Sequence, residues 1–279
     1  IKEAHVLYQQ QDYKKAAERY EEAIANDPTL SVAYFYLGNS YDQLYKPSRK
    51  GEAQNDDYLK KAIENYRKCA DTEKDPLLRK RSLEYLVNAY GPDKMADPGQ
   101  AVPIIEEMIK LEPTETTNYF MLATMYENGG NYEVAEQQLL KAKEMRPNSS
   151  DVYMQLAGFY NRLGEFEKTM QALDDRASKE PTNPEAFHTI AAYYWEKAYR
   201  DFRLKDAEKL KYIELGLQAE DKALQLKPDY IDALTYKNLL LRSKALVIKN
   251  PAEHQALTAE ANKLRDLARE LRKKKAGGQ

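Results

Sequence analysis

The chain has very little cysteine and no long apolar run. Cys69 is the only cysteine among 279 residues, which excludes an internal disulfide and any metal site built from several cysteines. A single thiol fits oxidising and reducing compartments alike. No stretch approaches the roughly 18 consecutive apolar residues that a membrane-spanning helix needs, so we expect a soluble chain.

The chain also lacks a surplus of positive charge. Its formal net charge is -2 and its pI is about 6.1, whereas neutralising nucleic-acid phosphates requires an excess of Lys and Arg. We therefore expect no nucleic-acid partner. The opening residues do not have the layout of a signal peptide, and the first residue, Ile1, is not Met. We expect that a segment preceded it, which leaves cytoplasmic and periplasmic or secreted locations open.

Residues that carry chemistry are scarce. The three histidines, His5, His188 and His254, have no Cys, His or acidic neighbour at the spacing of a metal motif. The sequence contains no Gly-rich phosphate loop, no G-x-S-x-G elbow and no Walker motif. The sequence therefore predicts no catalytic residues, no metal and no cofactor.

What the chain does contain is a repeated outline. Residues 118–147 and the segment after them each hold two runs of helical periodicity, split by a glycine turn and closed by a proline. The matching residues are 34 positions apart: Tyr119 and Tyr153, Leu122 and Leu156, Ala123 and Ala157, Tyr126 and Tyr160, Leu139 and Leu173, and Pro147 and Pro181. Each unit is predicted to be a helical hairpin.

This pattern resembles the tetratricopeptide repeat family, whose 34-residue unit has characteristic residues at fixed positions. The unit from residue 116 fills positions 4, 7, 8, 11, 20, 24, 27 and 32 with Tyr119, Leu122, Ala123, Tyr126, Ala135, Leu139, Ala142 and Pro147. The resemblance implies an all-α, right-handed superhelical solenoid of about seven hairpins with a C-terminal capping helix. Small residues at positions 8, 20 and 27 let paired helices approach closely.

The same register divides the whole chain. We expect one solenoid over residues 1–279, with a partial repeat at 1–28, repeats at 29–75, 76–113, 114–147, 148–181 and 182–228, and a last hairpin with the cap at 229–275. Extra residues fall between the two helices of several units, including Lys46–Asp57 and the stretch KAYRDFRLKDAEKLKY. In the latter we expect both helices to be lengthened and Asp206 to cap the second. These turns form either a docking edge or tolerated insertions.

The resemblance also implies a binding groove lined by the first helix of each unit. Positions 5, 9 and 12 of those helices are not needed for the core of the repeat. They supply the predicted partner-binding residues: Phe35, Asn39, Phe120, Met154, His188 and Trp195. One subtype of the family clamps the acidic tail of a chaperone with Lys, Asn and Arg at set positions. Only Asn39 of that set is present, so we do not expect this ligand.

Taken together, these features predict a non-catalytic scaffold that holds a protein or peptide partner, as a subunit or assembly factor of a larger complex. The groove and the edge of inserted turns are the two candidate surfaces. Two alternatives stay open, namely an adaptor for short peptides and an accessory or regulatory domain of an enzyme whose catalytic segment lies upstream.

Overall fold

The computed structural model describes residues 1–277 and contains only helices in that range. Contacts divide the chain into two compact units, Ile1–Met145 and Arg146–Gln279. The first unit contains α1 (Lys2–Gln9), α2 (Tyr13–Asn26), α3 (Ser31–Leu44), the 3-10 turn η1 (Pro47–Arg49), α4 (Ala53–Thr72), α5 (Pro76–Ala89), α6 (Pro98–Leu111), α7 (Thr116–Asn128) and α8 (Tyr132–Met145). The second contains α9 (Ser150–Arg162), α10 (Phe166–Lys179), α11 (Pro184–Arg200), α12 (Asp206–Leu226), α13 (Ile231–Val247) and α14 (Pro251–Gly277).

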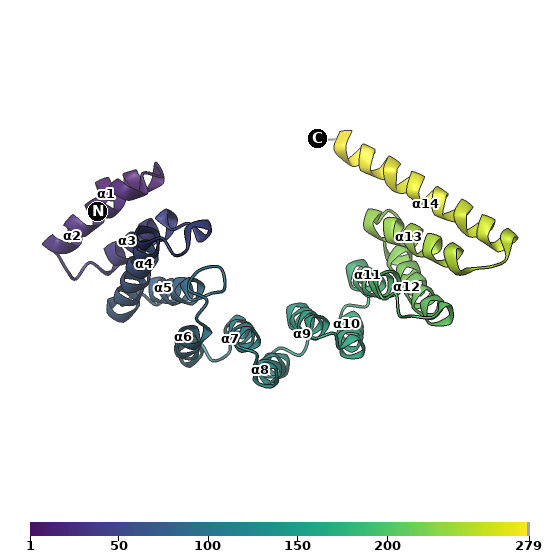
Figure 1. Cartoon of the computed structure of the whole chain (residues 1–279), viewed down its shortest axis with the longest axis horizontal. Helices are drawn as coiled ribbons and strands as arrows, with labels where there is room; N and C mark the ends of the chain where they lie inside the picture. The colour runs from purple at the N-terminus through teal and green to yellow at the C-terminus, as the bar shows by residue number, and fades with distance from the viewer. Residues whose placement is uncertain (278–279) are drawn as a thin grey trace. The chain divides into compact units, whose positions relative to one another are not determined.

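Successive helices pack in pairs, so each unit is built from hairpins that follow one another along the chain (Figure 1). The pairs are α1 with α2, α3 with α4, α5 with α6, α7 with α8, α9 with α10, α11 with α12, and α13 with α14. This arrangement confirms the expected all-α repeat fold.

Side-chain caps mark where several helices begin. The carboxylates of Asp12 and Asp97 accept hydrogen bonds from Lys15 N and Gln100 N, three residues further on. The Asn183 amide oxygen accepts from Glu185 N at the start of α11. These bonds satisfy backbone donors that have no partner inside the helix.

Small residues lie at the seams between paired helices. Ala62, Ala135 and Ala223 at position 20 or 27 are fully buried. Gly38, at position 8, is needed because a Cβ atom there would meet the Tyr66 ring at 2.8 Å. Close packing of the two helices therefore depends on these small residues, as the repeat pattern predicts.

The insertions extend helices as well as turns. In the sixth hairpin α11 has 17 residues and α12 has 21, which confirms that both helices are longer than usual. The expectation for Asp206 is wrong, because it is the first residue of α12 and Lys205 occupies the cap position. There the Glu208 carboxylate accepts a hydrogen bond from Lys205 N at 2.9 Å.

The last helix, α14, covers one side of α13 in Figure 1. Its buried residues are Ala261 and Ala268, and it is fastened to α13 by hydrogen bonds from Arg242 to Asn262 and from Arg272 to Thr235. Among residues 1–277, no helix combines the length and the apolar character needed to span a membrane.

Candidate functional site

The first-helix face, defined as positions 5, 9 and 12 of each hairpin's first helix, is buried at positions 5 and 9 of the second hairpin and partly accessible in later hairpins. In the first unit Phe35 is only 6% exposed and packs against the rings of Tyr66 and Tyr85, with centroids 6.1 and 5.5 Å away. Asn39 is buried too, and its side chain bonds to Phe35 O and the Tyr66 hydroxyl. The expectation that these two positions lie outside the core is therefore wrong for Phe35 and Asn39.

The physical reason is the size of the neighbouring residues. Tyr66 occupies position 24 of its own hairpin and Tyr85 belongs to α5 of the next, and both rings lie within contact distance of Phe35. Aromatic rings bury large areas and prefer such edge and tilted arrangements. The rings of Tyr66 and Tyr85 therefore cover Phe35, which smaller side chains at those two positions would leave exposed.

Phe120 and Met154 are the corresponding residues of the two middle hairpins. Phe120 is half-buried on α7 in the first unit, and Met154 is half-buried on α9 in the second. The Met154 thioether is engaged within its own unit, because Nη1 of Arg176 lies 3.1 Å from its sulfur. Both residues are therefore partly accessible to solvent.

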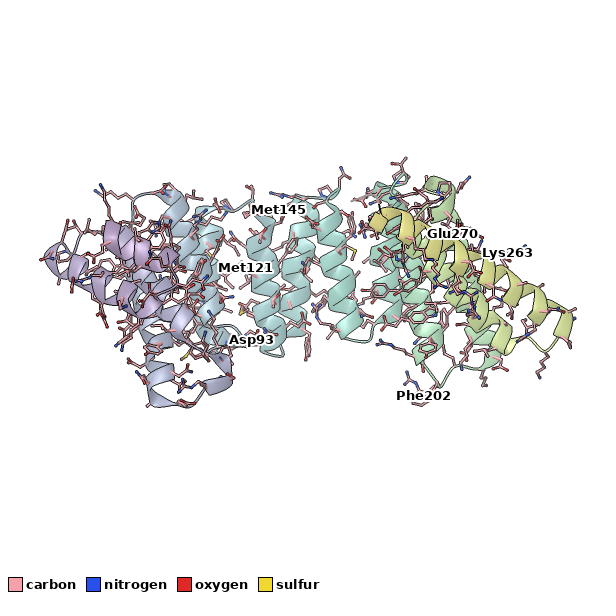
Figure 2. All side chains as sticks on the ribbon, turned by 90° about the horizontal axis from the view of Figure 1, so that it is seen from above. Asp93, Met121, Met145, Phe202, Lys263 and Glu270 are labelled. Atoms are coloured by element: carbon pink, nitrogen blue, oxygen red, sulfur yellow. The ribbon has the colours of Figure 1, made fainter. Side chains whose placement is uncertain are left out.

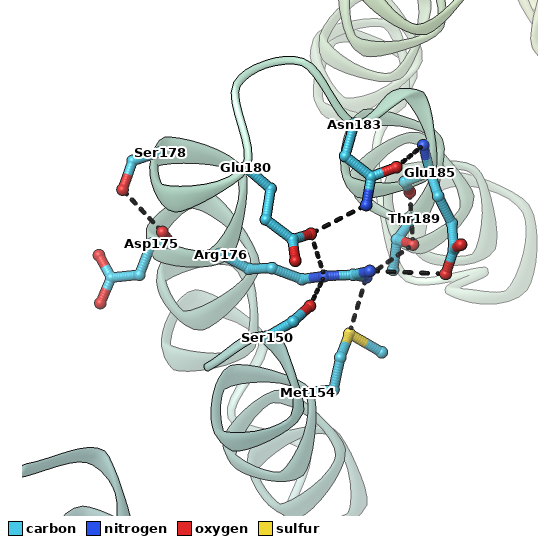
Figure 3. A network of polar contacts seen from close by, with 9 residues as sticks. All are labelled: Ser150, Met154, Asp175, Arg176, Ser178, Glu180, Asn183, Glu185 and Thr189. Atoms are coloured by element: carbon cyan, nitrogen blue, oxygen red, sulfur yellow. Dashed lines mark hydrogen bonds and ion pairs between the residues drawn. The ribbon is translucent and has the colours of Figure 1, made fainter. Parts of the chain in front are cut away.

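Arg176 is the centre of a polar network that links three helices (Figure 3). Its side chain is 7% exposed and reaches from α10 toward α9 and α11. Its guanidinium donates to Ser150 Oγ at 2.8 Å and Glu180 Oε2 at 3.2 Å, with Thr189 Oγ1 and Glu185 Oε1 at 3.4 and 3.5 Å. A planar guanidinium with five N–H groups suits such a site, where it ties adjacent hairpins together.

An aromatic group lies farther along α11. Trp195 stacks on Tyr199, one turn later, with ring centroids 5.1 Å apart and an interplanar angle of 10°. The edge of Tyr236 from α13 approaches Trp195 at 5.4 Å. Trp195 is therefore partly enclosed, whereas Tyr199 is 68% exposed. This stack places an aromatic surface beside solvent.

His188, the residue at position 5 of α11, is held by a buried acid. Its Nδ1 lies 2.8 Å from Oε1 of Glu220 on α12, and the rings of Tyr230 and Tyr236 present their edges to the imidazole. Glu220 is 0% exposed, and its Oε2 has no hydrogen-bond partner. Burial raises the pKa of the Glu220 carboxyl to about 7, while the bond to His188 acts in the opposite direction.

The turn between α11 and α12 carries a second exposed aromatic residue. Phe202 is 88% exposed at this turn, at the margin of the second unit in Figure 2. Beside it is a pocket of about 520 Å³ whose aromatic walls are Phe166, Tyr193 and Phe202. The remaining lining residues are Asn161, Gly164, Glu196, Lys197, Arg200, Asp201 and Arg203.

Ion pairs shape the rim of this pocket. Asp201 accepts from Nε of Arg203 at 2.9 Å and lies 3.0 Å from Nζ of Lys197. These hydrogen bonds, that of Arg203 first, hold the pKa of Asp201 well below its ordinary value. Lys197 also lies over the Phe166 ring, 5.2 Å from its centroid. Arg200 pairs with Glu196 at 2.8 Å and stays largely exposed.

Within residues 1–277 no three His, Cys, Asp or Glu side chains gather closely enough to hold a metal ion. The first unit has a larger hollow of about 680 Å³ between α4, α5 and α6. Its guanidinium, Arg67, is paired with Glu107 at 3.1 Å and with Asp71 at 3.6 Å. We therefore assign no chemistry to that hollow.

The sequence analysis did not identify four residues of the second unit that belong to these contacts. Glu220 and Arg176 stand at positions 24 and 27, where the other hairpins have residues such as Tyr66, Leu139 and Ala142. Their departure from the apolar pattern was readable from the sequence. Tyr199 and Phe202 lie in or next to the inserted stretch, where an aromatic residue has no role in the repeat core.

The comparisons with known proteins agree with this geometry. A family model described as "TPR repeat" matches residues 4–44, and one described as "Tetratricopeptide repeat" matches residues 116–149. The chain contains tetratricopeptide repeats. No curated protein matches its sequence.

Solved structures share the tetratricopeptide repeat fold. One is the C-terminal part of a TPR repeat-containing protein from Cytophaga hutchinsonii, with a TM-score of 0.59, 14% identity and coverage of 94% of each chain. Another is a tetratricopeptide repeat protein from Parabacteroides merdae, with a TM-score of 0.50, 16% identity, and coverage of 94% of this chain and 96% of that one. At these identities the likeness concerns the fold. The tetratricopeptide repeats themselves support a protein-interaction scaffold.

Proposed function

We propose that this tetratricopeptide repeat protein is a non-catalytic scaffold that holds a protein partner as a subunit or assembly factor of a larger complex. In the second unit the partner contacts the first-helix face at Met154, His188 and Trp195, and in the first unit the accessible predicted residue of that face is Phe120. Phe35 and Asn39 support this face from within the first unit, because they are buried under neighbouring tyrosines.

The observation that carries this proposal is the stack of Trp195 and Tyr199. Two large rings lie parallel on one helix, and the outer ring is 68% exposed although it could bury considerable apolar area. Binding energy at protein interfaces concentrates in a few Trp, Tyr and Arg anchors. Rings that are already stacked lose little conformational freedom when a partner covers them.

A second candidate surface is the edge formed by the inserted turns. In the first unit the Lys46–Asp57 insertion forms η1 and then the start of α4. Asn55 holds this turn by accepting from Lys46 N at 2.8 Å and donating to Lys46 O at 3.1 Å. A long turn with a fixed conformation favours a specific contact, because little ordering is needed on binding.

Affinity purification of the native complex with mass spectrometry tests the scaffold function, using the full chain and two sets of variants. A partner on the first-helix face and the adjoining Tyr199 ring should be lost when Tyr199→Asp is introduced or when Phe120→Asp and Met154→Asp are combined. A partner on the edge should instead be lost when the Lys46–Asp57 turn is shortened. Leu267→Asp, at an exposed leucine of α14, is the matched control and should retain the partner in either case.

The outcome that contradicts the proposal is equally concrete. If no protein accompanies the chain under any condition while the purified chain converts a small molecule, the scaffold function is wrong. If the partner proves to be a catalytic polypeptide whose activity changes on release of this chain, the accessory role of an enzyme replaces the assembly role.

A further inference from the structure

The pocket at the turn between α11 and α12 has features that the scaffold fold does not require. The repeat core needs neither Phe202, which is exposed, nor a hollow next to it. Exposed aromatic side chains cost solubility, and those beside a pocket mark interaction sites more often than isolated surface residues do. The pocket lies wholly within the second unit, since its lining residues run from 161 to 203.

We propose that this pocket, here called the α11–α12 turn pocket, binds a segment of a protein partner that has an aromatic or long aliphatic side chain flanked by acidic residues. This proposal rests on the proposed scaffold function and names the chemistry of the partner. The edge of the molecule, rather than the first-helix face, then provides the specificity.

The apolar part of the ligand follows from the walls. Phe166, Tyr193 and Phe202 offer three rings, and Phe166 is fixed by edge contacts to Tyr194 and Tyr212 at 6.0 and 5.4 Å. A volume of about 520 Å³ accommodates one large side chain with its adjoining backbone. A large side chain of the partner in this pocket would cover the exposed face of Phe202.

The acidic part follows from the rim. Of the five charged lining residues, Lys197, Arg200 and Arg203 are cationic, and only Glu196 and Asp201 are acidic. Asp201 pairs with Lys197 and Arg203, and its side chain is 12% exposed. Arg200 pairs with Glu196, whose side chain is 43% exposed, but the guanidinium side chains of Arg200 and Arg203 are more exposed, at 73% and 78%. The lining therefore has a net charge of +1 with its cations outermost, which complements carboxylates on a partner.

The same features argue for a protein rather than a lipid surface. A membrane anchor presents a protruding apolar face that inserts among acyl chains. Here Phe202 stands beside a hollow with rings on its other walls, so a single side chain fits the site better than a flat surface. The ordered arrangement of Asp201, Arg203 and Lys197 also fixes the rim before any ligand arrives.

The test is selection of short random peptides, displayed on phage, against the full chain. We expect enrichment of peptides with one aromatic or long aliphatic residue between Asp or Glu residues. Synthetic copies, followed by fluorescence anisotropy, should bind at least about tenfold more weakly to Phe202→Ala, the loss expected for one anchor. Arg200→Glu with Arg203→Glu should weaken binding further, and added salt should reduce the affinity of the unchanged chain.

Leu246→Ala is the matched control, because Leu246 is 84% exposed at the end of α13 and does not line the pocket. It should leave peptide affinity unchanged. Selection of neutral or basic peptides, or of none whose binding depends on Phe202, overturns the proposal. So does sedimentation of the chain with phosphatidylserine vesicles that is lost in Phe202→Ala, since that assigns the surface to a membrane.

The result also separates this proposal from the scaffold function. If Phe202→Ala retains the native partner in affinity purification and no Phe202-dependent peptide is found, the pocket proposal fails and the scaffold function stands. If Phe202-dependent peptides bind but no native complex exists, the pocket proposal stands and the scaffold function fails.

Discussion

The two units place different kinds of side chain at equivalent positions between paired helices. In the second hairpin, position 5 is Phe35 and position 24 is Tyr66, and the two rings pack together in an apolar core. In the sixth hairpin the same two positions are His188 and Glu220, which form a buried polar pair. Both hairpins consist of two paired helices, so the repeat pattern determines the helix pairing but not the residues packed between the helices.

The difference extends beyond this pair. The buried polar residues of the first unit are neutral, namely Asn39, Ser40, Asn55, Ser82, Thr116, Asn118 and Gln138. Within the described residues, the two buried charged side chains, Arg176 and Glu220, both belong to the second unit. Arg176 has several partners, whereas one Glu220 oxygen has none. Burying a charge is costly unless it is paired. We therefore expect Glu220 to lower the free energy of unfolding of the second unit.

Transferring the acid to the first unit should give the largest effect. Tyr66→Glu places a carboxylate at a fully buried position that has no imidazole beside it, and we expect a loss of roughly 4 kcal/mol or more in the free energy of unfolding. Circular dichroism during urea unfolding measures it. Tyr66→Phe is the control and should cost about 1 kcal/mol, because it removes only the long hydroxyl contacts. Equal effects of the two changes would contradict this reading of the core.

The reverse change should strengthen the second unit. Glu220→Leu combined with His188→Phe restores the residue types of Leu139 and Phe120 at positions 24 and 5, and we expect a gain of about 1 to 3 kcal/mol above pH 7, because the whole buried polar pair is replaced by apolar side chains. Fluorescence of Trp195, the only tryptophan, reports unfolding of this unit. Glu214→Leu on the exposed side of α12 is the control, with a change within about 0.5 kcal/mol. A loss of stability in this double variant would show that the pair of His188 and Glu220 is net favourable.

The pH dependence gives a smaller and more specific effect. Burial raises the pKa of folded Glu220 from 4.5 to about 7, so between these pH values the folded chain keeps a proton that the unfolded chain has released. The stability associated with this proton is complete below about pH 4.5 and is lost as the pH rises through about 7. Glu220→Gln cannot titrate, so its stability should fall less over that range when Trp195 fluorescence is followed.

Other titratable groups lie near Glu220 and are shared by the unchanged chain and the Glu220→Gln variant. His188 faces Glu220 from α11, Asp221 is its neighbour on α12, and Asp232 acts from α13. They are retained in Glu220→Gln, so the difference between the two pH profiles reports the Glu220 carboxyl together with its pairing to His188. Parallel profiles from pH 4.5 to 7 would mean that Glu220 is ionised throughout that range.

The sequence predicted the hairpins well because they depend on few rules. Tyr, Leu and small residues recur every 34 positions, and their burial at Tyr153, Leu156 and Ala157 follows directly from that period. The lengthened helices of the sixth hairpin were also predicted, since the inserted stretch has helical composition. The predicted cap of α12 was wrong by one residue, because the cap position is occupied by Lys205 and not by Asp206. The Glu208 carboxylate accepts the hydrogen bond from Lys205 N.

The candidate site was harder to predict, because it depends on residues far apart in the sequence. The burial of Phe35 follows from Tyr85, which belongs to another hairpin and lies 50 positions later. The environment of His188 depends on Glu220, Tyr230 and Tyr236. A repeat consensus assigns each position an average neighbour, and these positions have unusual ones.

The single thiol of the chain has a consequence for its chemistry. Cys69 is fully buried on α4, and burial raises its pKa, so both the shielding and the shortage of thiolate slow its reaction with alkylating reagents. Modification must wait until this hairpin opens. The rate at which a maleimide labels the native chain therefore measures how often the structure around α4 opens locally. No other thiol competes for the reagent, because Cys69 is the only cysteine of the chain.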